Sequence, residues 1–406
     1  MLVVVVFHTL LWVITVEGGQ LRIYPWAPGP VYWALSWPLA VVPVFFVAAG
    51  YANAVVVDTW HASKENYGAF LARRGTRLLG PMSLYGAFFI AFGTVAAWSG
   101  WPVEAATLSR QFAQLLWFAI CYQLLLAAAP AAVWLHDRLR GLELLPLLAA
   151  AIAVDVAVRA TGRLDLQWLN LAFVWPLTHQ LGIAYHRGWF RTWSPAVLWA
   201  GLGGTAAVIA GLVFGLGYPP AAVAWADVLV ANLLPPTMAV AVLGLAQTLL
   251  LALLQQAGVA ASPGRTAQRV VPLVNALSLT IYLWHIPAIV IAGGALAGLS
   301  LLLPALSTVL LNRVLLVALV LAIVAAACPW LARIELRLVP ALGARPPRRG
   351  AMELGYAGFC LGSFALWQTG GVLHPATPGP ALAALLFGAG VLGLRIAVGR
   401  TREATG

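Results

Sequence analysis

Long apolar segments recur along the whole chain, and they constrain its fold more than any other feature. About twelve can be marked, most of them near 20 residues long, with polar gaps of at most about 20 residues between them. A helix needs about 20 apolar residues to cross a bilayer core of about 30 Å, because each residue adds about 1.5 Å. The segments lie at about residues 1–16, 31–57, 78–99, 113–135, 142–158, 169–185, 195–217, 228–254, 271–297, 305–332, 352–368 and 381–398.

The composition agrees with a membrane location. The chain is 62% hydrophobic and 9% charged, whereas soluble domains carry about 25% charged residues. The segments are continuous rather than alternating over about ten residues, which favours spanning helices over a membrane barrel. We therefore predict an all-α fold, a polytopic transmembrane helical bundle of about 12 spans, with no soluble domain between them.

The basic residues indicate how the bundle is oriented. With a cytoplasmic N-terminus, 18 of the 23 Lys and Arg residues fall in segments on the cytoplasmic side, as the positive-inside rule requires. We therefore expect both termini to be cytoplasmic. The net charge of +11 is then explained by these loops, and no nucleic-acid partner is expected.

One basic segment divides the chain. Residues 336–350 contain several arginines and the helix breakers Pro340, Pro346 and Pro347, which indicates a cytoplasmic linker. It separates a membrane core, residues 1–335, from a further pair of spans and a short tail, residues 351–406. Three cysteines lie in apolar segments without the spacing of a metal site or a disulfide framework, so we expect them to pack as small apolar side chains and expect no bound metal.

Few ionisable side chains fall inside the predicted spans. Four of them stand out, His8, Asp155, His179 and His285, because such groups are costly in a membrane unless they have a function. Arg159 follows Asp155 by four residues, so these two are expected to pair on one helix face in a structural role. The histidines suit proton transfer near neutral pH. The alternative for each is a neutral histidine that only hydrogen-bonds a neighbouring helix.

A cluster of arginines precedes the third span. Arg73, Arg74 and Arg77 lie three and four residues apart, which places them on neighbouring surface of one helix. They could anchor the helix to lipid phosphates on the cytoplasmic side. The functional interpretation is a phosphate-binding site, because guanidinium groups bind phosphates in a forked geometry.

Six segments together resemble the acyltransferase 3 family of polytopic membrane enzymes, especially its actinobacterial-like branch. They occur in the family's order and the resemblance covers roughly residues 1–335. The segments are "VVVVFHT" (3–9), "VPVFFVAAGYANAV" (42–55), "FLARRGTRLLGPM" (70–82), "LLWFAICYQLLLAAAP" (115–130), "FVWPLTHQLGIAYHRGW" (173–189) and "ALSLTIYLWHIP" (276–287).

The resemblance implies a ten-span core that moves an acyl group from cytoplasmic acyl-CoA to a hydroxyl group. Acetyl is the expected group, and acyl-CoA is a co-substrate rather than a bound cofactor. The acceptor would be a glycan, a lipid or a small molecule, and the enzyme would lie in a bacterial plasma membrane as a multi-pass protein among membrane lipids.

The resemblance also implies roles for particular residues. His8 matches the proposed catalytic histidine, Arg74 and Arg77 match the donor-binding arginines, and Tyr122 is a weaker match to an aromatic residue of the fourth span. We expect His8 to act as the base that takes the acceptor's proton.

Two further histidines have less defined roles. His179 or His285 could orient His8, bind the acceptor or stabilise the oxyanion, and the sequence does not rank these roles.

The first apolar segment departs from the family pattern. A basic residue is expected about ten positions before the catalytic histidine, but only seven residues precede His8. We therefore expect residues 1–13 to be the C-terminal two-thirds of a first helix whose start lies upstream. The competing class of protein is a membrane transporter or a flippase for lipids or glycans, whose polar residues would line a pathway and for which CoA would be irrelevant.

Overall fold

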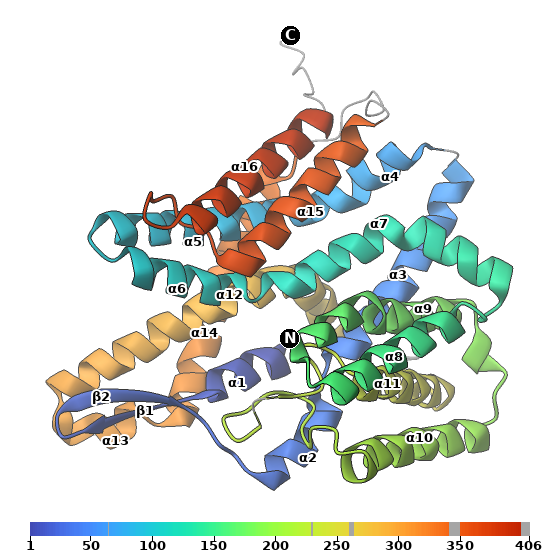
Figure 1. Ribbon diagram of the computed structural model, residues 1–406, viewed down its shortest axis with the longest axis horizontal. Coiled ribbons are helices and arrows are strands. Elements are labelled where there is room, and N and C mark those ends of the chain that lie inside the picture. The colour runs from blue at the N-terminus through green and yellow to red at the C-terminus, as the bar shows by residue number, and fades with distance from the viewer. Residues whose placement is uncertain (64, 229, 260–263, 341–349, 399–406) are drawn as a thin grey trace.

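Helices dominate the chain in the computed structural model, which describes residues 1–406 except 64, 229, 260–263, 341–349 and 399–406 (Figure 1). Among the described residues, nine helical segments are long and apolar enough to cross a membrane, and one two-stranded hairpin is the only sheet. The predicted all-α polytopic helical bundle is confirmed. The nine segments are Pro30–Ser63, Tyr67–Trp98, Leu116–Leu139, Leu144–Thr161, Pro195–Gly215, Met238–Gln256, Gln268–Leu302, Arg313–Leu338 and Pro378–Val398.

The helices follow the predicted apolar segments, with several ends displaced. In the first half they are α1 (Leu2–Leu10), α2 (Pro30–Leu39), α3 (Val42–Ser63), α4 (Tyr67–Arg74), α5 (Leu79–Trp98), α6 (Pro102–Ala113), α7 (Leu116–Leu139), α8 (Leu144–Thr161) and α9 (Val174–His186). In the second half they are α10 (Pro195–Ala210), α11 (Met238–Gln256), α12 (Arg265–Leu302), α13 (Ser307–Leu310), α14 (Arg313–Leu338), α15 (Ala351–Thr369) and α16 (Pro378–Val398).

Three predicted spans correspond to helices outside that set of nine. They are residues 1–16, 169–185 and 352–368, which became α1, α9 and α15. Helix α1 has 9 residues and α9 has 13, so each is shorter than the about 20 residues that a lone spanning helix needs. The total of twelve spans stays a prediction.

The first apolar segment is helical only to Leu10, so the expectation of a helix through residue 16 is wrong. Strand β1 (Trp12–Glu17) pairs antiparallel with β2 (Gln20–Pro25). Gly18 and Gly19 form the turn with φ of 60° and 76°, and a two-residue hairpin turn favours glycine because it needs positive φ. The β-branched residues of Val13–Val16 favour a strand, so the chain leaves the helix here.

Hydrogen bonds join helix ends that the basic residues place on the same side. Arg187, just after α9, donates to Asp58 near the end of α3 and to Asp137 near the end of α7. On the opposite side, Trp98 Nε1 at the end of α5 donates to the Leu373 carbonyl between α15 and α16 at 2.9 Å. These contacts support the predicted alternation of the chain between the two sides.

Helices α3 and α9 approach closely enough for their backbones to touch. A Cβ atom added at Gly50 would lie 1.9 Å from the carbonyl oxygen of His179, and one added at Gly182 would lie 1.9 Å from that of Val47. Only glycine fits at such a crossing, and small residues commonly allow close helix packing in membranes. The crossing fixes the position of α9 within the bundle.

The C-terminal pair of helices packs against the core (Figure 1). Helices α15 and α16 meet at glycines: a Cβ atom at Gly390 would lie 2.5 Å from the carbonyl oxygen of Gly358. Tyr356 of α15 donates to the carbonyl of Gln123 in α7 at 2.9 Å, and its ring fills the space beside Gly75. The predicted linker, residues 336–350, lies largely outside the described residues.

Candidate active site

His8 lies near the C-terminal end of α1 and is half-buried. Its Nδ1 atom is 2.9 Å from the carbonyl oxygen of Val4, one turn earlier in the same helix. A carbonyl only accepts hydrogen bonds, so Nδ1 carries the proton in the neutral ring and Nε2 keeps its lone pair. His8 is therefore oriented as a hydrogen-bond acceptor through Nε2.

His285 of α12 lies directly beside His8. The two ring centroids are 4.9 Å apart, although His8 lies near the start of the core sequence and His285 towards its end. The His285 side chain is buried, and its Nδ1 lies 3.2 Å from the Ile281 carbonyl. Its Nε2 is buried and has no hydrogen-bond partner among the described residues. Each of the two rings thus has an Nε2 atom that can accept a hydrogen bond.

A cavity of about 590 Å³ opens beside His8. Its walls come from α1, α2, the start of α7 and the loop before α11, and they are almost entirely apolar. Phe7 and Trp225 form part of the wall, with ring centroids 4.9 Å apart. The size falls within the range of about 300–1,000 Å³ that is usual for ligand sites.

Contacts at the end of α1 hold this wall in place. Arg313 donates a hydrogen bond to the carbonyl of Leu10, where a cation also stabilises the C-terminal end of a helix dipole. The same guanidinium stacks on the Trp26 ring at 3.7 Å. Trp26 follows the hairpin, and its N–H donates to the Leu11 carbonyl at 2.8 Å, so the hairpin returns the chain to the end of α1.

The arginine cluster divides into two parts. Arg73 is exposed and pairs with Glu65, whereas Arg74 and Arg77 form no ion pair within the part of the chain that the structure describes. Helix α4 ends at Arg74, and a 3₁₀ turn, Gly75–Leu78, carries Arg77. Tyr122 of α7 lies within electrostatic range of both Arg74 and Arg77. Two unpaired guanidinium groups and a phenol thus share one site.

Helix α7 connects this cluster with the histidines. Phe118 precedes Tyr122 by one turn and lies 5.1 Å from Tyr282, ring to ring. The ring centroids of Tyr282 and His285 are 6.0 Å apart. Ring contacts therefore run from Phe118 through Tyr282 to His285 and His8, and they begin one helical turn from Tyr122.

His179 lies apart from the other candidate residues. It is buried at the crossing of α3 and α9, where the Asn53 amide donates to its Nε2 at 3.0 Å. It does not line the cavity beside His8. Its surroundings agree with the alternative drawn from the sequence, a neutral histidine that bonds a neighbouring helix.

Asp155 has a structural role, but the predicted pairing with Arg159 is wrong. The buried carboxylate accepts four hydrogen bonds at 2.7–2.8 Å, from Gln167, Asn170, Tyr218 and the backbone N–H of Met238. Met238 begins α11, and a helix N-terminus attracts negative charge. Arg159 lies instead 4.0 Å from the centre of the Tyr218 ring.

A second buried acid was not identified from the sequence. Glu335 of α14 is buried and accepts hydrogen bonds from Thr280 at 2.5 Å and from Trp284 at 3.1 Å, both in α12. Arginines flank it at positions 333 and 337, and it lies just beyond the predicted span of residues 305–332, where the sequence gives no sign of burial. Because Trp284 is adjacent to His285, this acid fixes the segment of α12 that carries the histidine.

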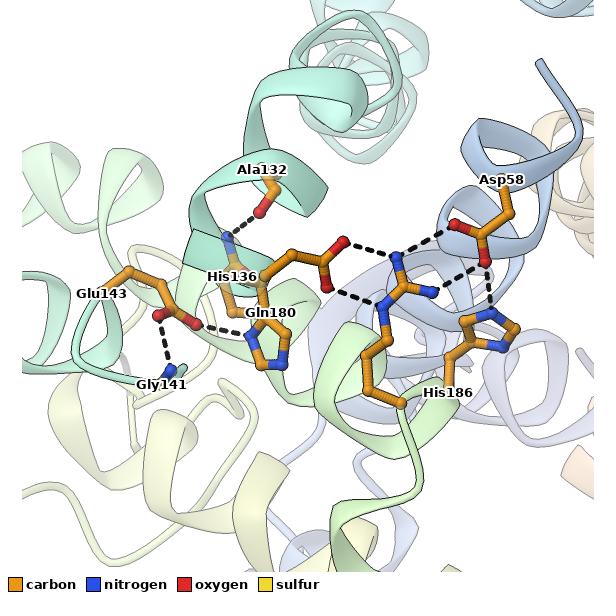
Figure 2. A network of polar contacts seen from close by, with 9 residues as sticks. Asp58, Ala132, His136, Gly141, Glu143, Gln180 and His186 are labelled. Atoms are coloured by element: carbon orange, nitrogen blue, oxygen red, sulfur yellow. Dashed lines mark hydrogen bonds and ion pairs between the residues drawn. The ribbon is translucent and has the colours of Figure 1, made fainter. Parts of the chain in front are cut away.

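Figure 2 shows a polar network on the predicted cytoplasmic side that sequence reasoning also missed. His136 and Glu143 are both buried, and their Nδ1 and Oε1 atoms lie 2.6 Å apart. Nearby, Arg187 bridges Asp58 and Asp137. Hydrogen bonds raise the pKa of the Arg187 guanidinium, and the bond to Asp58 contributes more than the bond to Asp137. The network ties together the ends of α3, α7, α8 and α9.

Comparisons with known proteins give one match. A family model described as an acyltransferase domain, that of the acyltransferase 3 family, matches residues 1–333. The matched region contains His8, Arg74, Arg77, Tyr122, His179 and His285, and it ends before Glu335 and α15. No curated protein and no solved structure matches the chain.

Proposed function

The chain belongs to the acyltransferase 3 family, and from this premise we propose that it moves an acyl group from acyl-CoA to a hydroxyl group of a carbohydrate, a glycolipid or a secondary metabolite. Family membership and the apolar helices make it a multi-pass membrane acyltransferase. Acetyl-CoA as the donor, O-acylation as the reaction and the bacterial plasma membrane as the location are parts of the proposal.

The pairing of His8 with His285 beside the cavity carries the proposal. Acyl transfer to an alcohol needs a base that takes the hydroxyl proton. His8 has its proton on Nδ1 and its lone pair on Nε2, which is the form that a base requires. His285 offers a second Nε2 without a partner among the described residues.

The transfer step follows from these positions. The acceptor oxygen forms a bond to the carbonyl carbon of the thioester while its proton passes to Nε2 of His8. The carbon–sulfur bond then breaks, and the imidazolium returns the proton to the sulfur of CoA. We assign His285 to orienting the hydroxyl or holding the proton, because its ring lies beside that of His8.

Arg74 and Arg77 are assigned to the donor. Forked guanidinium groups bind phosphates well, and CoA carries several phosphates. Both arginines lack an ion-pair partner within the described residues, unlike their neighbour Arg73, which pairs with Glu65. The aromatic contacts through Phe118 link this site to the histidines.

Incubation of the purified protein with radiolabelled acetyl-CoA and an extract of membrane lipids and glycans tests the proposal. We expect a labelled product that is absent with His8→Ala. Absence of both labelled product and CoA binding would instead favour a transporter or flippase.

A further inference from the structure

The cavity beside His8 is far larger than an acetyl group requires. It measures about 590 Å³, whereas acetyl has three heavy atoms. Residues from Leu2 to Leu10 line it along α1, a length of about 12 Å at about 1.5 Å per residue. The site therefore accommodates an elongated group as well as the reacting atoms.

The cavity wall offers few polar groups, and the protein itself occupies two of them. Ser36 donates to the Trp33 carbonyl at 2.6 Å and accepts from the Ala222 N–H at 2.8 Å. The Tyr282 hydroxyl donates to the Leu115 carbonyl at 2.9 Å. A sugar enclosed here would lose its hydration and find few replacement partners, which is costly. A hydrocarbon chain fits this wall, and a bare glycan does not.

One wall of the cavity also forms the surface of the molecule. Leu2, Leu35 and Leu39 line the cavity and are 63%, 47% and 51% exposed. Leu35 and Leu39 belong to a segment long and apolar enough to span a membrane, where exposed leucines face lipid. A chain that comes from the bilayer could thus enter between α1 and α2.

The assigned donor site lies elsewhere. Arg74, Arg77 and Tyr122 do not line the cavity. The phosphate end of the donor would therefore lie outside the cavity, and only Phe118 and Tyr282, near the histidines, belong both to the cavity wall and to the aromatic contacts that lead from α7 to His285. The cavity is then left for the acceptor.

We propose that the cavity binds the hydrocarbon chain of a lipid-borne acceptor and so brings its hydroxyl-bearing head group to His8. This inference rests on the proposed acyl transfer and narrows its acceptor to an amphipathic lipid. Apolar burial supplies the affinity for the chain, at up to about fourfold in binding for each buried methylene.

An acceptor series tests the inference with protein reconstituted in lipid nanodiscs. Methyl, octyl and dodecyl glucoside are compared with acetyl-CoA as the donor. We expect kcat/KM for the acceptor to rise at least tenfold from methyl to dodecyl. Val6→Phe, which fills the cavity, should reduce this ratio to less than threefold. The matched control Val95→Phe lies on α5 at a position 68% exposed and outside the cavity, and it should keep the ratio.

The second arm varies the donor. Acetyl-CoA and decanoyl-CoA are compared with methyl glucoside as the acceptor. If the longer acyl chain raises kcat/KM, Val6→Phe removes that gain and the acceptor chain has no effect, then the cavity holds the donor's chain. That result overturns the proposal.

A binding readout separates this inference from the proposed function. Dodecyl glucoside with a diazirine in its chain is cross-linked to the protein, and the labelled peptides are mapped. Labelling of α1 and α2 that dodecyl glucoside blocks and Val6→Phe removes would support chain binding even if no acyl transfer occurs. Labelling that is neither blocked nor changed by Val6→Phe would overturn it.

Discussion

The imidazole rings of His8 and His285 lie 4.9 Å apart, and each directs its Nδ1 atom to the carbonyl four residues earlier in its own helix. In both rings, Nε2 is therefore the nitrogen that keeps its lone pair. This arrangement assigns the proton-accepting atoms from hydrogen-bond geometry alone.

Replacement of His8 by alanine is expected to remove most of the acyl transfer. Loss of a general base costs on the order of 10²–10⁴ in rate. The measurement is kcat with acetyl-CoA and the acceptor that responds in the extract, after size-exclusion chromatography confirms folding. His61→Ala is the control, because this histidine is exposed near the end of α3. A folded His8→Ala variant with full activity would refute the assignment of the base.

Replacement of both histidines tests whether they act together. If His285 works through His8, then His285→Ala should lower kcat in the native background and have little further effect in the His8→Ala background. Residues that act as a unit show such non-additivity. Independent, multiplicative losses of kcat would contradict a shared role.

Loss of the arginines should weaken donor binding selectively. A charge-assisted hydrogen bond contributes about 1.5–3 kcal/mol, so Arg74→Ala or Arg77→Ala should raise KM for acyl-CoA about tenfold or more. Arg73→Ala is the matched control, because Arg73 pairs with Glu65 at the surface. An unchanged KM in the double variant Arg74→Ala with Arg77→Ala would remove the donor-site assignment.

Disruption of the buried pair His136–Glu143 is expected to destabilise the protein. Removal of one partner from a buried pair leaves an unpaired polar group, at a cost of about 1–3 kcal/mol. Glu143→Ala should lower the midpoint of thermal unfolding in detergent, whereas Asp165→Ala, in an exposed pair with Arg163, should hardly change it. Equal midpoints for the two variants would argue against a structural role for the pair.

The crossing of α3 and α9 should tolerate no side chain. A Cβ atom at Gly182 would lie 1.9 Å from the Val47 carbonyl oxygen, so Gly182→Ala should reduce the yield of folded protein. Gly203→Ala in α10 is the control, since nothing lies within 4 Å of an added Cβ there. Folded protein at the native yield from Gly182→Ala would show that the crossing is looser than the backbone contact indicates.

The helices could be predicted because the length of an apolar segment is read directly from consecutive residues, without knowledge of tertiary contacts. The hairpin after Leu10 was missed because its β-branched residues, Val13–Val16, extend the same apolar segment. The Gly18–Gly19 turn was the available signal, since two glycines between β-branched segments favour a hairpin.

The sequence predicted which residues belong to the candidate site, but it did not predict how they are arranged in space. His8, Arg74 and His285 stand out by type and motif, whereas the contact between His8 and His285 arises from packing of α1 against α12. Glu143 and His136 lie next to polar loop residues, and only the fold buries them. His136 and Glu143 lie on either side of the turn between α7 and α8. No helical or strand periodicity in the sequence therefore indicates that they pair.

The hydrogen bond from each histidine to its own helix makes the distance between the two rings depend on helix packing. Each ring is hydrogen-bonded to the backbone of its own helix. The distance between the two rings therefore depends on the distance between α1 and α12. Val5 packs there against Ala288 and Ala292. Small changes of side-chain volume at that interface would change the distance between the two rings without altering either histidine. Related enzymes could thus adjust turnover through residues that never meet a substrate.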